Sequence, residues 1–287
     1  MIVPGFNHRF PKEGDDDYLW SFADCHARPD PLIETCCTTL DAALAAQSRG
    51  AGRIELCTDL SAGGFTPPRD LIREVVNQLS IPVNVLIRPS ARDNSAGVVP
   101  SETRSHPRLV RGRGPCVAWE GSSEARRFQR EPQSASRAED YGFSAEDFVY
   151  NESDLEQMVE EIEYCKTVGA AGIVVGALTP EGIVDLPAMR RLIVAARPLS
   201  VTFHRAFDVC TEDPFTALDK IIALGCDRLL TSGQAPAAWE GRGRLRLLVR
   251  RASGRRVVMP GGGVTPDNLS DLAAFTLARE FHGTRIP

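Results

Sequence analysis

The sequence predicts an α/β protein, a TIM-type (β/α)8 barrel of parallel strands. Eight short apolar runs recur along the chain, and most of them end in polar residues. Stretches with helical periodicity separate the runs, and strict alternation of strand and helix favours a parallel sheet. The predicted strands are Leu32–Cys36, Arg53–Cys57, Val83–Arg88, Gly172–Leu178, Ser200–Phe207, Arg228–Thr231, Arg256–Met259 and Arg279–His282. Eight strands favour a closed barrel over a doubly wound sheet, which is the structural alternative.

Apolar stripes and end signals predict the helices. One stripe is Leu71, Ile72, Val75, Val76 and Leu79, and a second is Leu155, Met158, Val159, Ile162 and Cys165. A third helix is expected over Phe215–Leu224, with Asp213 as N-cap, Pro214 in its first turn and Gly225 just past its end. The chain stops five residues after the eighth strand, at Pro287, so we expect the last helix to be missing.

Two segments do not follow this alternation. Residues 1–30 form an N-terminal extension with no clear unit. Residues 91–146 are rich in Ser, Arg, Gly, Pro and Glu and show no sustained period, which predicts a disordered insertion. We therefore expect one barrel domain over residues 31–287, interrupted by this insertion.

Composition excludes several classes of protein. The formal net charge of −5 gives no reason to expect a nucleic-acid partner. No apolar run approaches the roughly 20 residues of a membrane span, and no signal-peptide core is present. The eight cysteines then indicate free thiols in a cytoplasmic protein, with nuclear access left open. A homo-oligomer is also left open.

The strand ends carry the candidate site, because a barrel's functional face lies at the carboxyl ends of its strands. Residues two apart on a strand share a face. Glu34 and Cys36 are such a pair on the first strand, Glu55 and Cys57 on the second, and Arg88 ends the third. The non-functional alternatives are that each cysteine is a small buried hydrophobe and that Glu55 and Arg88 form a structural ion pair.

Further polar residues follow later strands. The fifth strand leads into His204, Arg205 and Asp208, and the eighth ends in His282, two residues after Glu280. Thr231 and Ser232 end the sixth strand, and Gly261, Gly262 and Gly263 follow the seventh, where barrels often bind phosphate. The structural alternatives are that His204 is a hydrogen-bonded core histidine and that the three glycines only form a tight turn.

Several of these segments together resemble the CutC copper homeostasis family. They are Arg53–Cys57, Ile87–Pro89, Val201–Asp208, Leu230–Gly233, Val258–Gly263 and Glu280–His282, in that order. The resemblance covers roughly residues 31–90 and 147–284. It implies a TIM-like barrel in the cytoplasm, a role in copper handling, and Cu(I)-binding cysteines at Cys36 and Cys57. The insertion, the early C-terminus and residues 1–30 depart from the family pattern, so a non-functional fragment is a further alternative.

Two functions follow. In the first, Cys36 and Cys57 bind Cu(I), a soft ion that accepts two or three sulfur ligands. In the second, the chain is a barrel lyase or isomerase that acts on a small phosphorylated or carboxylated metabolite. The sequence does not decide between these two functions, so whether the protein is an enzyme stays open. The catalytic candidates are then Glu55, His204 and Asp208. The candidates for binding the metabolite are Glu34, Arg88, Arg205, Thr231, Ser232, Gly261, Gly262, Gly263 and His282.

Overall fold

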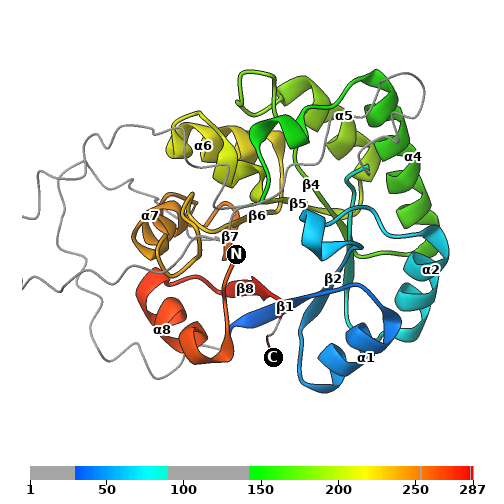
Figure 1. Cartoon of the computed structure of the whole chain (residues 1–287), viewed down its shortest axis with the longest axis horizontal. Helices are drawn as coiled ribbons and strands as arrows, with labels where there is room; N and C mark the ends of the chain where they lie inside the picture. The colour runs from blue at the N-terminus through cyan, green and yellow to red at the C-terminus, as the bar shows by residue number, and fades with distance from the viewer. Residues whose placement is uncertain (1–29, 90–141, 253, 285, 287) are drawn as a thin grey trace, which may run out of the picture.

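Eight parallel strands form the barrel in a computed structural model that describes residues 30–89, 142–252, 254–284 and 286 (Figure 1). The hydrogen-bonded order is β7-β6-β5-β4-β3-β2-β1-β8. The strands are β1 (Leu32–Cys37), β2 (Arg53–Leu56), β3 (Val83–Leu86), β4 (Gly172–Val175), β5 (Ser200–Phe203), β6 (Arg228–Thr231), β7 (Val257–Pro260) and β8 (Glu280–Gly283). The predicted TIM-type barrel is confirmed, with β7 and β8 at the two ends of the hydrogen-bonded order.

A helix connects each pair of consecutive strands and packs outside the barrel (Figure 1). These helices are α1 (Leu40–Ser48), α2 (Arg69–Gln78), α4 (Glu152–Val168), α5 (Leu186–Ala196), α6 (Pro214–Leu224), α7 (Arg242–Ala252) and α8 (Pro266–Thr276). Asp213 caps α6 by accepting hydrogen bonds from the main-chain N–H groups of Phe215 and Thr216, as predicted. No helix follows β8 among the described residues.

Strand register separates two faces. Glu34 lies opposite Arg53, and Cys36 lies opposite Glu55, so these four residues face the barrel interior. The alternate residues, such as Ile33, Ile54 and Leu56, face the helices and belong to the main hydrophobic core. Burying this apolar layer between sheet and helices provides most of the drive to fold. The barrel interior therefore remains free to hold polar groups.

The structure corrects several predicted boundaries. β3, β4 and β5 are shorter than expected; β5 ends at Phe203 because His204 begins a 3-10 helix, η5 (Arg205–Val209). Asp208 therefore lies on η5 and not on a strand. Residues 142–146, expected within the disordered insertion, are described, and Ala145 starts the 3-10 helix η4 (Ala145–Phe148). Residues 1–29 and 90–141 lie outside the described residues, so the remaining predictions for them stay predictions.

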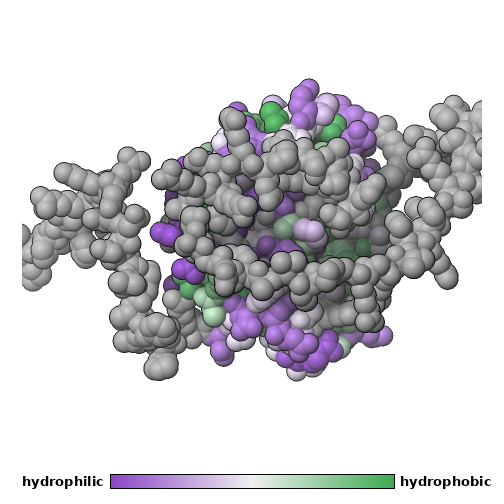
Figure 2. All heavy atoms as spheres, turned by 60° about the vertical axis from the view of Figure 1, so that its left-hand side comes forward, coloured by the Kyte–Doolittle hydropathy of each residue, from purple (hydrophilic) through white to green (hydrophobic). Residues whose placement is uncertain are grey.

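Figure 2 shows one face of the molecule. The coloured part of the face shown in Figure 2 is mostly hydrophilic, with small separate hydrophobic patches. None of the helices in the described part of the chain is both long and apolar enough to cross a bilayer.

Candidate functional site

A cavity of about 450 Å³ opens at the carboxyl ends of the strands. Nine of the residues predicted from the sequence line it: Cys36, Glu55, Cys57, Arg88, His204, Arg205, Gly262, Gly263 and His282. Five others do not line it: Glu34, Asp208, Thr231, Ser232 and Gly261. These nine residues come from six separate strands or the segments that follow them, and the volume suits a small-molecule site.

Two cysteines from neighbouring strands meet at the base of this cavity. The Sγ atoms of Cys36 and Cys57 lie 3.4 Å apart. Cys36 Sγ also lies within 4.8 Å of a carboxylate oxygen of Glu55 and of a ring nitrogen of His282. The oxygen and the nitrogen are themselves within 4.8 Å of each other. Thiol, carboxylate and imidazole therefore converge on one point, with a second thiol beside it. This is a donor set that a metal ion can use.

Charge at this point is held mainly by Glu55 and His282. Glu55 Oε2 and His282 Nε2 lie 2.9 Å apart, although the ring N–H is not directed at the oxygen. Burial lowers the pKa of His282, but the interaction with Glu55 and the charge of Glu34 together outweigh it, so the net direction is upward. The hydrogen bond with Cys57, burial and the charge of Glu55 raise the pKa of the Cys36 thiol. Without a cation, the Cys36 thiol is therefore protonated at neutral pH.

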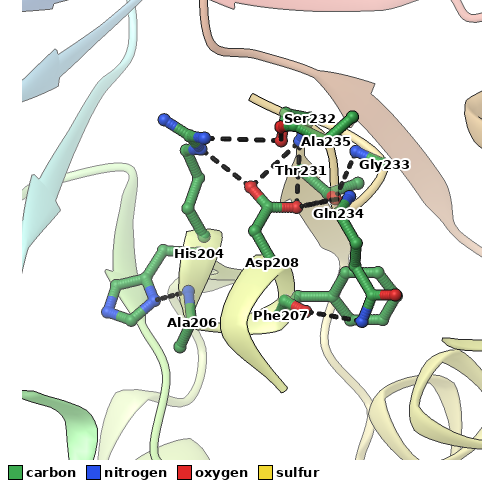
Figure 3. A network of polar contacts seen from close by, with 10 residues as sticks. His204, Ala206, Phe207, Asp208, Thr231, Ser232, Gly233, Gln234 and Ala235 are labelled. Atoms are coloured by element: carbon green, nitrogen blue, oxygen red, sulfur yellow. Dashed lines mark hydrogen bonds and ion pairs between the residues drawn. The ribbon is translucent and has the colours of Figure 1, made fainter. Parts of the chain in front are cut away.

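His204 is fixed by its own main chain. Its Nδ1 accepts a hydrogen bond from the Ala206 N–H at 3.2 Å, which caps η5 and assigns the ring proton to Nε2 (Figure 3). Gly176 leaves room for the ring, because a Cβ there would come within 2.5 Å of Nδ1. Burial, with the Arg88 charge, lowers the pKa of His204 to about 3. The ring is therefore neutral at physiological pH and presents an N–H donor rather than a base.

Arg88 lies at the cavity wall between two aromatic rings. Its guanidinium carbon is 4.9 Å from the centroids of both Phe65 and Phe148. One guanidinium nitrogen donates to the Gly64 carbonyl at 3.2 Å, and another lies 3.9 Å from an Asp147 carboxylate oxygen. The structural alternative of an ion pair between Glu55 and Arg88 is not found among the described residues, where Glu55 pairs with His282. The stacked rings hold the cation in place.

Asp208 organises the loop after β6 (Figure 3). Its carboxylate is fully buried and accepts from the Thr231 hydroxyl, from the main-chain N–H groups of Ser232 and Gln234, and from Arg205 Nε at 2.8 Å. Arg205 also donates to the Ser232 hydroxyl at 3.3 Å. Asp208 and the two hydroxyls therefore lie behind Arg205 and orient it toward the cavity.

A layer of charged residues lies below the cysteines inside the barrel. Arg53 donates to Glu34, and to Glu280 at 2.6 Å, while Arg228 donates to Glu280 at 2.9 Å. Asn84 completes the layer with a 3.1 Å hydrogen bond to Glu34. Glu34 is fully buried among these partners. The structure thus places Glu34 in a structural network one layer beneath the cavity.

The glycine loop after β7 forms the part of the cavity wall next to Arg205. Gly262 adopts a φ of 89°, in the left-handed region that favours glycine, and an added Cβ would lie 3.2 Å from the Arg205 guanidinium carbon. Gly261 lies behind the wall, where a Cβ would come within 2.4 Å of Leu230. The glycines therefore bring the main chain against Arg205.

Sequence reasoning missed two groups of residues. Arg53 shares the inward face of Glu55 and could have been found by extending the two-residue alternation. Phe143 and Phe148 also line the cavity, but they come from η4 and the residues just before it, far along the chain from β3. No local pattern indicated that they would return to this site.

The structure is a TIM-type barrel with a polar cavity at the carboxyl ends of its strands. The CutC family model matches residues 31–95 and 144–286, and the chain belongs to the CutC family. It is 38% identical to the CutC family protein of Parabacteroides distasonis over 252 residues, which are 88% of this chain and 81% of that protein. It is 36% identical to the CutC family protein of Histophilus somni over 250 residues, covering 87% and 80% of the two chains.

Solved structures agree with this assignment. The crystal structure of a proposed copper homeostasis protein, CutC from Streptococcus agalactiae, matches with a TM-score of 0.67 and 27% identity, covering 90% of this chain and all of that one. The aldolase QR15 matches with a TM-score of 0.52 at 12% identity, covering 88% and 89% of the chains. At that identity the second match concerns the barrel fold alone.

Proposed function

We propose that this chain binds Cu(I) through Cys36 and Cys57 and serves copper homeostasis in the cytoplasm. The observation that carries the proposal is the 3.4 Å contact between the two Sγ atoms, with Glu55 and His282 beside it. Thiolates from two neighbouring strands form a soft donor pair, and soft donors favour Cu(I) over harder divalent ions. The name of the Streptococcus agalactiae relative points the same way.

The donor chemistry fits the ion. Cys57 is fully buried and Cys36 nearly so, which protects a bound Cu(I) from water and oxidants. Each thiol that binds must lose its proton, so binding should release protons to solvent. The new thiolate charge is then balanced by the cation. His282 and Glu55 lie close enough to supply a third ligand or to orient the sulfur atoms.

Removing both thiols is expected to weaken Cu(I) binding by more than about 100-fold, since loss of even an outer partner of a metal ligand costs roughly 10–100-fold. The test is Cu(I) titration of the Cys36→Ser/Cys57→Ser variant against a competing chelator. Cys25 and Cys116 should be serine in all proteins compared, which removes two further thiols. Cys37→Ser is the matched control, because Cys37 is adjacent in sequence and faces the helices. Unchanged affinity and stoichiometry in the double variant would refute the proposal.

A second function, a lyase or isomerase acting on a small anionic metabolite, is favoured by the size and lining of the cavity. Copper held between two thiolates does not need Arg88, His204 and Arg205 around a 450 Å³ space. In this function Glu55 and His282 would exchange protons with the substrate, and His204 would donate a hydrogen bond to it. A thermal-shift screen of carboxylated and phosphorylated metabolites tests it, and failure of all of them to raise the melting temperature would count against it.

A further inference from the structure

We propose that the side of the cavity formed by Arg88, His204, Arg205 and the Gly262–Gly263 loop binds the carboxylate or phosphate group of a small molecule. The inference goes beyond copper binding. The inference shares one element with the second proposed function, namely that the ligand is a small anionic metabolite.

His204 supplies the main observation. Its Nδ1 is used as an acceptor by the Ala206 N–H, so the ring proton lies on Nε2. Nε2 is buried and has no hydrogen-bond partner among the described residues. Figure 3 shows this nitrogen on the side of the ring away from Ala206. A buried donor without an acceptor is costly, so an acceptor oxygen from a ligand would satisfy it.

The guanidinium groups of Arg88 and Arg205 line the same part of the cavity as His204. Arg88 is clamped between Phe65 and Phe148, and Phe148 also packs on the His204 ring, with ring centroids 5.0 Å apart. Arg205 reaches the cavity from its anchor on Asp208. Among the described residues, Arg205 pairs with Asp208, which is buried behind the loop, and Arg88 lies near Asp147, which is partly exposed to solvent. Preorganised guanidinium groups suit carboxylate and phosphate oxygens.

The glycine loop adds main-chain donors. Gly262 and Gly263 line the cavity, and no described residue accepts a hydrogen bond from either N–H group. Gly262 also lets the main chain approach the Arg205 guanidinium closely, because an added Cβ would fall 3.2 Å from it. A ligand oxygen between His204 and this loop would therefore meet donors of three kinds: imidazole, guanidinium and amide.

The proposed anion site and the two cysteines belong to the same cavity. Cys36, Glu55 and His282 line the same cavity, so an anionic group held by Arg88 and His204 would place the rest of its molecule toward them. The ligand class that fits is a compact carboxylated or phosphorylated metabolite, within the size that a cavity of about 450 Å³ admits.

The test is calorimetric titration of the full chain with malonate and, separately, with inorganic phosphate, at constant ionic strength and without copper. Glycerol is the uncharged control. We expect at least one anion to bind and glycerol not to bind; the tighter anion identifies the preferred group. His204→Asn should weaken that binding roughly 10- to 100-fold, because asparagine can still cap η5 but lacks the Nε2 donor.

Arg88→Met is the second variant, and it keeps the apolar contacts of the side chain between the two phenylalanines. It should weaken anion binding by at least about 10-fold. Absence of binding by both anions, or equal binding by the wild type and both variants, would overturn the inference. The same titration of Cys36→Ser/Cys57→Ser separates the proposals: anion binding there should persist whether or not copper binding does.

Discussion

Arg53→Met is expected to destabilise the barrel by about 3–5 kcal/mol, the cost of breaking a buried ion pair from one side. Arg53 is 5% exposed and bridges Glu34, which is fully buried, to Glu280. Methionine leaves the Glu34 carboxylate inside the barrel with Asn84 as its remaining partner. Chemical denaturation followed by circular dichroism measures the loss of unfolding free energy.

Two controls separate this explanation from simple loss of packing. Arg69→Met removes a surface ion pair with Glu161 and should lower the unfolding free energy far less than Arg53→Met does. The double variant Arg53→Met/Glu34→Met removes both charges, so it should be more stable than Arg53→Met alone, with Arg228 still pairing Glu280. A double variant that loses the sum of both single effects would show that unpaired charge is not the cause.

Acid is expected to destabilise the folded chain through His204. Burial and the Arg88 charge lower the folded-state pKa of His204 to about 3, whereas an unfolded histidine titrates near 6.5. The unfolded chain therefore binds the extra proton first as pH falls. The contribution of neutral His204 to the unfolding free energy is fully present above about pH 6.5. It is lost progressively toward pH 3, by about 1.4 kcal/mol per pH unit within that window.

His204→Asn provides the reference, because asparagine does not titrate in this range. The difference in unfolding free energy between wild type and variant should shift by about 2.5 kcal/mol against the wild type from pH 6 to pH 4. Subtracting the variant removes the contribution of the carboxylates, which titrate in both proteins. A difference that stays constant over this range would mean that His204 is not held neutral by its surroundings.

Much of the site could be predicted because strand geometry is local. Alternation with a period of two places Cys36 and Cys57 on inward faces, and parallel strands bring their ends to one rim. The pairing of β1 with β2 then brings the two cysteines near one another, and the structure places their Sγ atoms 3.4 Å apart. The Asp213 cap and Pro214 likewise fixed the start of α6 from neighbouring residues alone.

The features of the site that the sequence did not predict depend on contacts between distant segments of the chain. Sequence alone could not tell which inward residue lies at the rim and which lies a layer below, so Glu34 was expected in the cavity and instead pairs with Arg53. The early end of β5 arises because His204 bonds the Ala206 N–H, an alternative to continuing the strand. Phe148 returns to Arg88 across an interruption of the barrel pattern that carries no periodicity.

The central claim is that Cys36 and Cys57 together hold one Cu(I). X-ray absorption at the copper K-edge, on full-length protein loaded with one equivalent of Cu(I), tests this most directly. Cys25 and Cys116 are again replaced by serine. We expect two sulfur ligands to copper, retained in Cys37→Ser and lost in Cys36→Ser/Cys57→Ser. A spectrum with only nitrogen and oxygen ligands, or an unchanged sulfur signal in the double variant, would contradict it.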